Sequence, residues 1–286
     1  MAPIRIVTDS TNYLPSNLVA TNEIGVVSLY VNEGGATTRE SELDVDAFYD
    51  RLRNTENLPT TSQPSLGDFL AVYEPLLAAG HDIASVHLTA GISGTLETAR
   101  QAAGEAQTTH PGRRVEIMDS GSTAGGLAMA VLSAAAAARG GADVDAVAAR
   151  AKEARAAGRT WFALETLEYL RRGGRIGAAQ ALLGSALKVK PILTMQGEVL
   201  PIERVRTSRR AFERLVDFAR ELKETGADAW MVQHIQAPEQ AAALEARVTE
   251  LFGHGPFCIS EMGPVVGAHV GPGLLGVGGL PARLLE

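Results

Sequence analysis

The sequence predicts two α/β domains: a three-layer α/β/α domain built on a parallel sheet at residues 1–157, and an α/β domain with a mixed sheet at residues 158–286. Two observations lead to this prediction. Short apolar runs alternate with helical segments through the first half, which is typical of a parallel sheet with helices on both faces. The second half contains two neighbouring β-rich runs joined by a tight turn, as in an antiparallel hairpin. A length of 286 residues also suits two cores better than one.

The first domain is expected to contain four strands connected by helices. The predicted strands are Ile4–Val7, Ile24–Val31, Ile83–Leu88 and Val115–Met118. The predicted helices are Val45–Arg53, Leu66–Ala78, Thr95–Ala106, an alanine-rich helix ending near Arg139, and Asp143–Ala157. Ser65, with Asp68 three residues later, is typical of a capped helix start. Residues 59–65, PTTSQPS, place two prolines around polar residues and are expected to be irregular.

The second domain is expected to be a mixed sheet with helices packed on it. Its predicted strands are Thr160–Leu164, Ile192–Met195, Val199–Val205 and Ala229–Ile235, and its predicted helices are Ser208–Thr225 and Pro238–Phe252. Gln196 and Gly197 are predicted to form the hairpin turn. Three β-type runs separated by glycines end the sequence: Ile259–Met262, VVGAH at 265–269 and LLGVGGL at 274–280.

The composition is that of a globular protein. Hydrophobic residues make up 45% of the chain and charged residues 21%, and the net charge of −7 argues against nucleic-acid binding by the whole surface. The single cysteine, Cys258, excludes an intramolecular disulfide and a thiolate metal site. The six histidines are scattered, without the i, i+4 spacing of a metal-binding helix. We therefore expect no metal and no cofactor.

The start of the chain does not resemble an export signal, because MAPIRIVTDS lacks an apolar core. The longest apolar-looking stretch, Ala124–Ala138, is too short and too rich in alanine to span a bilayer. We therefore expect a cytoplasmic protein that is not integral to a membrane, and transient contact with a membrane surface stays open.

Three predicted strands of the first domain end in turns rich in hydroxyl groups. These turns are Thr8–Thr11, Ser93–Thr95 and Asp119–Ser122. Open α/β sheets bind ligands at the carboxyl ends of their strands. The turn at Ser93 also opens a helix, whose free N–H groups and dipole favour an anion. Simple helix capping explains each turn singly about as well as ligand binding does.

The same residues allow a hydrolase interpretation. Ser93, Asp119 and His269 occur in the chain order of an α/β-hydrolase triad. A nucleophile elbow requires G-x-S-x-G, however, and Thr95 stands where the final glycine should be. Neither a G-x-x-x-x-G-K-[ST] loop nor a G-x-G-x-x-G turn after a strand occurs, which argues against nucleotide binding. A serine esterase therefore stays as the alternative function.

His269 lies in a glycine-rich segment, GPVVGAHVGPG at residues 263–273, where small residues would let a ligand approach the backbone. Its imidazole could donate a hydrogen bond to a carboxylate oxygen, most strongly when charged. A buried structural histidine explains the pattern equally well, and both interpretations stay open from the residues alone.

Positive charge is concentrated between residues 171 and 214. That segment holds ten Lys and Arg against three Glu, a local charge of +7, while the rest of the chain carries −14. Such a concentration in an acidic protein indicates a phosphate site or a docking face for an acidic partner. Solvation of a helix surface accounts for Arg209, Arg210 and Arg214, but less well for the arginines of the RRGGR turn and the RVR strand.

Several motifs together resemble those of the DegV family of fatty-acid-binding proteins, over essentially the whole chain and in the family's order. They are TDST, PTTSQPS, AGISGT, VEIMDSGS, LEYLRRGGRIG, KPIL and GPVVGAHVGPGLLGV. The resemblance implies a DegV-like fold of two α/β domains with a buried fatty acid of the palmitate, stearate or oleate class. It implies a lipid carrier rather than an enzyme. The residues that it places at the carboxylate are Thr61, Ser93 and His269, with Thr95 and Ser62 next in line.

The resemblance also implies a protein partner. Members of the FakB type present the bound acid to a separate ATP-using fatty acid kinase, and the acyl-phosphate then passes on to phospholipid synthesis. Arg175 and Arg206 stand where the family's basic residues meet the acyl-phosphate or the kinase. Arg172 and Arg204 are the neighbouring alternatives for this role.

Overall fold

The computed structural model describes residues 2–183 and 189–286. Its N-terminal half is built on a four-stranded sheet in the order β2-β1-β6-β7, in which every neighbouring pair is parallel. The strands are β1 (Ile4–Asp9), β2 (Gly25–Val27), β6 (Asp82–His87) and β7 (Val115–Asp119). Because all four strands run the same way, their carboxyl ends meet at one edge of the sheet.

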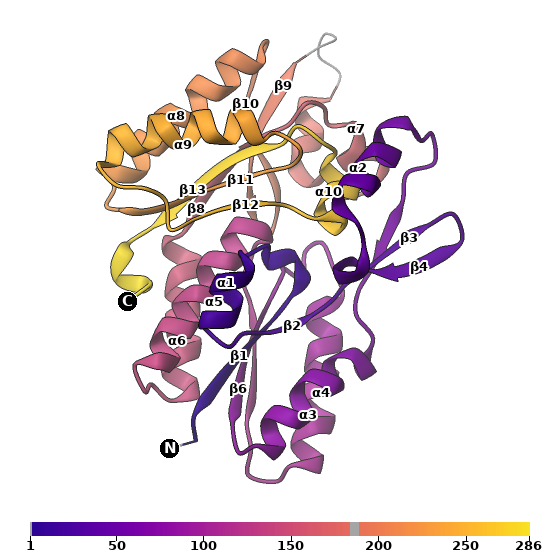
Figure 1. Cartoon of the computed structure of the whole chain (residues 1–286), viewed down its shortest axis with the longest axis vertical. Helices are drawn as coiled ribbons and strands as arrows, with labels where there is room; N and C mark the ends of the chain where they lie inside the picture. Colours follow the sequence, from indigo (N-terminus) through magenta and orange to yellow (C-terminus); the bar gives the residue numbers. More distant parts are fainter. Residues whose placement is uncertain (1, 184–188) are drawn as a thin grey trace.

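Helices cover both faces of this sheet (Figure 1). The helices of this half are α1 (Ser16–Thr21), α3 (Leu66–Ala78), α4 (Thr95–Thr109), α5 (Ala124–Arg139) and α6 (Val144–Ala157). Successive residues of a strand point to opposite faces. Val7 and Ile83 therefore pack with α3 and α4, whereas Ile6 and Ala84 pack with α5 and α6. The predicted three-layer α/β/α arrangement is confirmed.

The start of α3 has the capping box that the sequence predicts. The Ser65 hydroxyl accepts a hydrogen bond from the Asp68 backbone N–H at 3.2 Å, and the Asp68 carboxylate accepts one from the Ser65 backbone N–H at 2.8 Å. Two N–H groups that the helix itself leaves without partners are thereby satisfied.

A small antiparallel sheet in the order β4-β3-β5 stands beside the main sheet (Figure 1). Its elements are β3 (Tyr30–Glu33), β4 (Ala36–Arg39) and β5 (Thr60–Ser62), with a 3₁₀ turn (Glu40–Glu42) and α2 (Val45–Asn54) between β4 and β5. The predicted strand Ile24–Val31 is therefore wrong as one element, because its two ends belong to different sheets. The change of sheet occurs where the backbone N–H of Leu29 donates to the Ser10 hydroxyl instead of to a neighbouring strand.

The expectation that residues 59–65 are irregular is wrong for three of them. Thr60, Thr61 and Ser62 form β5 and pair with β3. Pro59 and Pro64 flank the strand rather than interrupt it, so no ladder hydrogen bond is lost. The β-branched threonines suit an extended backbone.

The C-terminal half is built on a six-stranded mixed sheet in the order β10-β9-β8-β13-β11-β12. Its strands are β8 (Arg159–Ala163), β9 (Lys190–Gln196), β10 (Glu198–Val205), β11 (Ala229–His234), β12 (Cys258–Glu261) and β13 (Leu275–Leu280). Only β11 and β12 are parallel among its neighbouring pairs in the described residues. The predicted mixed sheet and its hairpin are confirmed, with Gly197 alone, at φ +78°, linking β9 to β10.

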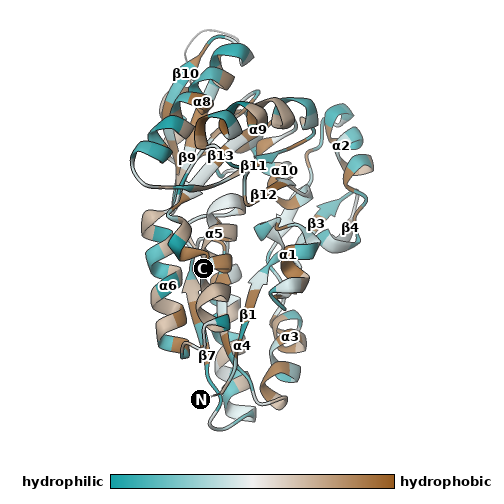
Figure 2. Cartoon of the chain, turned by 60° about the vertical axis from the view of Figure 1, so that its left-hand side comes forward, coloured by the Kyte–Doolittle hydropathy of each residue, from teal (hydrophilic) through white to brown (hydrophobic). Residues whose placement is uncertain are grey.

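Two helices cover one face of the mixed sheet. They are α8 (Ser208–Glu224) and α9 (Pro238–Phe252). α8 carries both hydrophilic and hydrophobic residues along its length (Figure 2). Its apolar side packs with α9 on Trp230, Val232 and Val277 of the sheet. The opposite face of the sheet turns towards α5, whose Leu127 shares a core cluster with Met231 and Leu280. The predicted boundary at residues 157 and 158 falls between α6 and β8 and stays a prediction.

The prediction of a β-type run at VVGAH is wrong, because these residues lie in α10 (Pro264–Val270). Pro264 at the first helical position has the backbone angle that a helix start needs. The Val265 N–H donates to the buried Glu40 carboxylate at 2.8 Å. The Tyr49 hydroxyl contacts the carbonyls of Met262 and Gly263, at 2.8 and 2.9 Å. Contacts from distant parts of the chain therefore override the β preference of the two valines.

Of the helices in the described residues, none combines the length and hydropathy of a membrane span.

Candidate functional site

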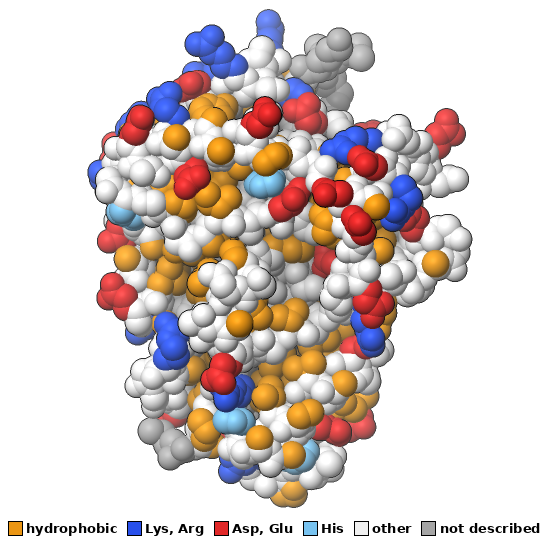
Figure 3. Space-filling model, viewed as in Figure 1, with side chains coloured by type: hydrophobic (Ala, Val, Ile, Leu, Met, Phe, Trp, Pro, Cys, Tyr) orange, Lys and Arg blue, Asp and Glu red, His pale blue; other side chains and the backbone are white. Residues whose placement is uncertain are grey.

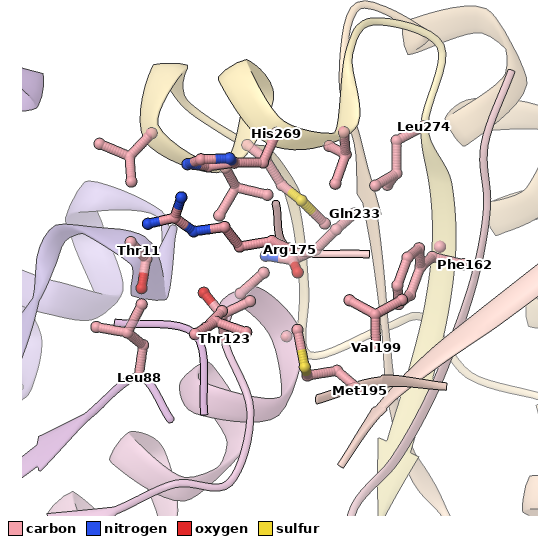
Figure 4. Close-up of a pocket in the computed structure, with 18 of the residues that line it drawn as sticks. Thr11, Leu88, Thr123, Phe162, Arg175, Met195, Val199, Gln233, His269 and Leu274 are labelled. Carbon is pink, nitrogen blue, oxygen red and sulfur yellow. The ribbon is translucent and has the colours of Figure 1, made fainter. Parts of the chain in front are cut away.

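A cavity of about 380 Å³ lies between the two halves of the molecule. The carboxyl edge of the parallel sheet, β5 and α10 surround one end of it. The face of the mixed sheet opposite α8 and α9 forms the other end. Figure 4 shows the polar side chains of Thr11, Arg175 and His269 at the first end, and Phe162, Val199 and Leu274 at the second. The cavity is therefore polar at one end and apolar at the other.

Four of the five residues predicted to bind the carboxylate lie at this cavity. Thr61, Ser62, Ser93 and His269 line it. Thr95 is fully buried behind Ser93 and supports it: the two hydroxyl oxygens lie 2.9 Å apart, and the Thr95 backbone N–H donates to Ser93 Oγ at 3.2 Å. When the Thr95 hydroxyl also donates to Ser93, the Ser93 proton is free to point into the cavity.

His269 is linked to Thr61 by a hydrogen bond of 2.7 Å between Nε2 and Oγ1. Burial, and second the nearby Arg175, lower the pKa of His269 to about 4. The ring is therefore neutral at pH 7. A neutral imidazole carries one proton, on either of its nitrogens.

The surroundings of the ring decide which nitrogen carries that proton. His269 Nδ1 is buried and has no hydrogen-bond partner among residues 2–183 and 189–286. Placing the proton on Nε2 leaves no buried N–H without a partner, which is the arrangement that folded proteins favour. Nε2 then donates to Thr61 Oγ1, and the Thr61 hydroxyl turns its own proton towards the cavity. Thr61 becomes a donor, which suits a carboxylate.

Gln63 holds the two donors Thr61 and Ser93 in place, and sequence reasoning did not identify it. Its Nε2 donates to the Thr98 hydroxyl of α4 at 2.8 Å, so the β5 segment is tied to the helix that Ser93 precedes. Its Oε1 lies against Gly94, where a Cβ would approach to 2.1 Å. The signal was present in the sequence, because a glutamine two residues after Thr61 and a glycine directly after Ser93 stand inside the two motifs.

Asp9 organises the edge of the parallel sheet from below the cavity. Its carboxylate is fully buried and accepts hydrogen bonds from the Thr11 hydroxyl at 2.6 Å, the Leu88 N–H at 2.9 Å and the His87 ring at 3.1 Å. Thr11 and Leu88 line the cavity, whereas Asp9 does not. In the hydroxyl-rich turn Thr8–Thr11, the hydroxyl that lines the cavity, that of Thr11, therefore already donates its proton to Asp9.

The four predicted arginines fall into two groups. Arg175 lines the cavity, donates to the Gly173 carbonyl at 2.7 Å, and extends its guanidinium beneath the His269 ring in Figure 4. Arg172, Arg204 and Arg206 do not line it. Arg172 donates to the Glu56 carbonyl. Arg204, in β10, and Arg206, directly after it, are exposed. Figure 3 shows several Lys and Arg side chains at the upper end of the face that it draws. Lys188 of the basic segment lies outside the described residues.

The residues of the esterase alternative do not form a catalytic relay. His269 bonds to Thr61 and Ser93 to Thr95, while the Asp119 carboxylate accepts from the Gly121 N–H at 2.7 Å. No hydrogen bond joins any two of the three proposed residues in the described part of the chain. A nucleophilic serine needs a base within hydrogen-bond reach, so the geometry does not favour hydrolysis.

A Ser–His–Asp series does occur elsewhere, but it is sealed in the core. Ser85 Oγ lies 2.7 Å from His87 Nε2, and His87 Nδ1 lies 3.1 Å from the Asp9 carboxylate. All three side chains are fully buried, and none lines the cavity. With no route for a substrate, this series orders the strand ends of the parallel sheet.

Comparison with known proteins identifies the family. Residues 3–282 match the profile of the DegV family, described as uncharacterised proteins. A DegV domain-containing protein of Streptomyces coelicolor is 41% identical over 279 residues, which cover 96% of this chain and 97% of that protein.

Solved structures agree with this match. The fatty-acid-binding DegV family protein of Thermus thermophilus superposes with a TM-score of 0.87 at 35% identity, over 98% of this chain and 99% of that one. DegV of Bacillus subtilis, a fatty acid binding protein, gives a TM-score of 0.86 at 33% identity, over 98% and 100% of the two chains. The protein described here belongs to the DegV family.

Proposed function

We propose that this chain binds a long-chain fatty acid in the cavity, with the carboxylate at the Thr61 end and the acyl chain extending towards Phe162. The observation that carries the proposal is the 2.7 Å hydrogen bond between His269 Nε2 and Thr61 Oγ1 at the polar end of a largely apolar cavity. With the proton on Nε2, the Thr61 hydroxyl points its own proton into that cavity. Ser93 supplies a second hydroxyl, and Ser62 and Thr95 stand beside the first two. The DegV proteins of Thermus thermophilus and Bacillus subtilis, at 35% and 33% identity, are themselves fatty-acid-binding proteins.

The energetics agree with a lipid carrier. Burial of each methylene contributes about 0.8 kcal/mol, so the chain of palmitate gains on the order of ten kcal/mol before ordering costs. The head group then needs only neutral donors. No reaction at the cavity requires a nucleophile of this chain, and we propose a binding protein rather than an enzyme.

The finer part of the proposal concerns a partner. We infer that the protein presents the carboxylate to a separate ATP-using fatty acid kinase and carries the acyl-phosphate towards phospholipid synthesis in the cytoplasm, as the FakB type does. Arg175 at the polar end of the cavity supplies a cation for the phosphate. The exposed Arg204 and Arg206, with Arg172, would meet the kinase.

Mass spectrometry of the purified protein under native conditions tests the binding proposal. We expect a co-purifying fatty acid in the wild type. Ser93→Ala and Thr61→Ala should each weaken palmitate binding by about 1–3 kcal/mol, or roughly 5- to 150-fold, because each removes a donor to a buried charged group. Thr37→Ala, at an exposed hydroxyl of the same small sheet as Thr61, is the matched control. A wild-type protein that is empty and takes up neither palmitate nor oleate would contradict the proposal.

A further inference from the structure

The central strands of the mixed sheet form the apolar end of the cavity, and one of them presents no side chains there. In β13, Gly276, Val277 and Gly278 all line the cavity, but the Val277 side chain packs in the core beneath α8 and α9. Residues of a strand alternate between faces, so the two glycines point to the cavity side. A glycine inside a strand often marks a place where another group approaches the backbone closely.

The register of the neighbouring strands shows what surrounds these glycines. β8 and β11 lie on either side of β13, and their cavity-facing residues form two rows across the sheet. The rows are Phe162–Gly276–Gln233 and Thr160–Gly278–Met231. In each row a glycine is flanked by two larger side chains. The absence of a side chain at the middle position leaves a hollow in the sheet surface, which we call the glycine hollow.

Little space remains for a side chain in either row. A Cβ at position 276 would lie 3.3 Å from both the Phe162 Cβ and the Trp161 carbonyl oxygen, so β8 would have to shift by a few tenths of an ångström. A Cβ at position 278 would lie 2.7 Å from the Thr160 Cγ2 and 3.0 Å from the Arg159 carbonyl oxygen. A methyl group at 276 would therefore enter the glycine hollow after a small shift of β8, whereas one at 278 would strain the sheet more.

Phe162 borders the same region from the neighbouring strand β8, directly beside Gly276. Figure 4 places its ring with Val199 and Leu274 at the end of the cavity opposite to His269 and Thr11. A ligand whose head group is held at Thr61 has its far end at these side chains. The space between Gly276 and the Phe162 ring is therefore where a longer chain would have to fit.

We propose that Gly276 and Phe162 set the length of acyl chain that the cavity accepts. The absence of a side chain at position 276 makes room for the last carbons of the acyl chain, and the Phe162 ring limits how far the acyl chain can extend. This inference rests on the proposed fatty-acid binding. Substitutions at the two positions act in opposite directions, because one fills the glycine hollow and the other opens it. Each methylene that no longer fits costs about fourfold in affinity.

Calorimetric titration with myristate and stearate tests the inference. In Gly276→Ala, the ratio of stearate to myristate affinity should fall at least fourfold relative to the wild type. In Phe162→Ala, that ratio should rise. Gly104→Ala adds the same methyl group to α4, where no described residue other than the neighbouring backbone of the helix lies within 4 Å of it. This variant is the matched control and should leave the ratio unchanged. Circular dichroism melting shows whether each variant folds.

The outcomes separate the two proposals. A wild type that binds neither acid contradicts the proposed function itself. A wild type that binds both, with Gly276→Ala and Phe162→Ala changing the two affinities by one common factor, overturns the role in chain length and leaves fatty-acid binding intact. Should Gly276→Ala fail to fold, Phe162→Ala decides alone: an unchanged or lower ratio overturns the inference.

Discussion

At the scale of single residues, the protonation of His269 is the most consequential property of the site. Burial keeps this ring neutral, and the lack of a partner for Nδ1 within the described residues favours the proton on Nε2, from which the ring donates to Thr61. The imidazole therefore contacts Thr61 and sets the direction in which the Thr61 hydroxyl donates its hydrogen bond. A charged ring would give the site a stronger clamp for an anion but would have to be desolvated in a buried place.

This property predicts a pH dependence of stability. Since the pKa of His269 is about 4 when folded and 6.5 in the ordinary case, the unfolded chain takes up a proton that the folded chain refuses. The free energy of unfolding should be insensitive to this residue above pH 6.5 and should decrease by about 3 kcal/mol as the pH falls to 4. Urea titrations of the wild type and His269→Gln at pH 7 and 4.5 measure the difference. An equal loss in both proteins would contradict the prediction, and the exposed His254→Asn is the control.

At the scale of elements, α10 is held in place by a carboxylate from a different sheet. Glu40, directly after β4, is buried and accepts hydrogen bonds from Ser10, from the Tyr13 hydroxyl at 2.8 Å and from the Val265 N–H at 2.8 Å. Burial raises the pKa of this carboxyl. The small sheet thus supplies Thr61 to His269 and also fixes the helix that carries His269.

Glu40→Ala should therefore weaken fatty-acid binding although Glu40 does not line the cavity. Loss of the carboxylate leaves the buried Val265 N–H and the half-buried Ser10 and Tyr13 hydroxyls without their acceptor, which should cost about 2–4 kcal/mol of stability. Hydrogen exchange of peptides covering residues 263–270 should become faster, and palmitate affinity should fall. Glu42→Ala, at an exposed carboxylate two residues later, is the control. Unchanged exchange in the α10 peptides would show that other contacts hold the helix.

At the scale of the whole molecule, charge is divided unevenly. Residues 171–214 carry a local charge of +7 in a chain of net charge −7. The exposed Arg204, Arg206, Arg209 and Arg210 lie at the end of β10 and the start of α8. An acidic partner would be drawn to this end of the molecule and repelled from the remainder, which favours one orientation of approach.

Reversal of charge at this end separates ligand binding from partner binding. If a fatty acid kinase is the partner, as proposed above, Arg206→Glu should reduce phosphorylation of bound palmitate at least tenfold, and more at low salt than at high salt. Palmitate affinity should stay that of the wild type, because Arg206 does not line the cavity. Arg100→Glu, an exposed arginine of α4, serves as the control. Loss of palmitate binding in Arg206→Glu would instead assign that arginine to the pocket.

The sequence predicts most of this architecture, because alternating strands and helices have strong local signals. Helices Leu66–Ala78 and Pro238–Phe252 were predicted with the bounds that the structure has. The segments that sequence reasoning misassigned, β5 and α10, take their form from partners far along the chain. In α10 those partners are Glu40 and Tyr49, which no local pattern connects to it.

In the candidate site, too, local sequence motifs predict some features, and contacts between distant residues determine the others. Motifs locate Thr61, Ser93 and His269, and the fold brings all three to one cavity. The neutrality of His269 depends on burial, and the bridging by Gln63 depends on a contact with α4, so neither can be derived from spacing. The depth of the cavity at Gly276 needs the register of three strands, which the LLGVGGL run alone does not reveal.

The hydrogen bond from the Thr11 hydroxyl to Asp9 has a consequence for the chemical class of head group that the cavity admits. Because the proton of Thr11 is committed to a fully buried carboxylate at 2.6 Å, only oxygen lone pairs remain to face the cavity. A carboxylate, which has no proton to give, is disfavoured beside Thr11, whereas a fatty alcohol or a primary amide could donate there. In the proposed binding mode, an acid would therefore have one favoured orientation at the polar end of the cavity, with its oxygens turned to Thr61 and Ser93 and away from Thr11.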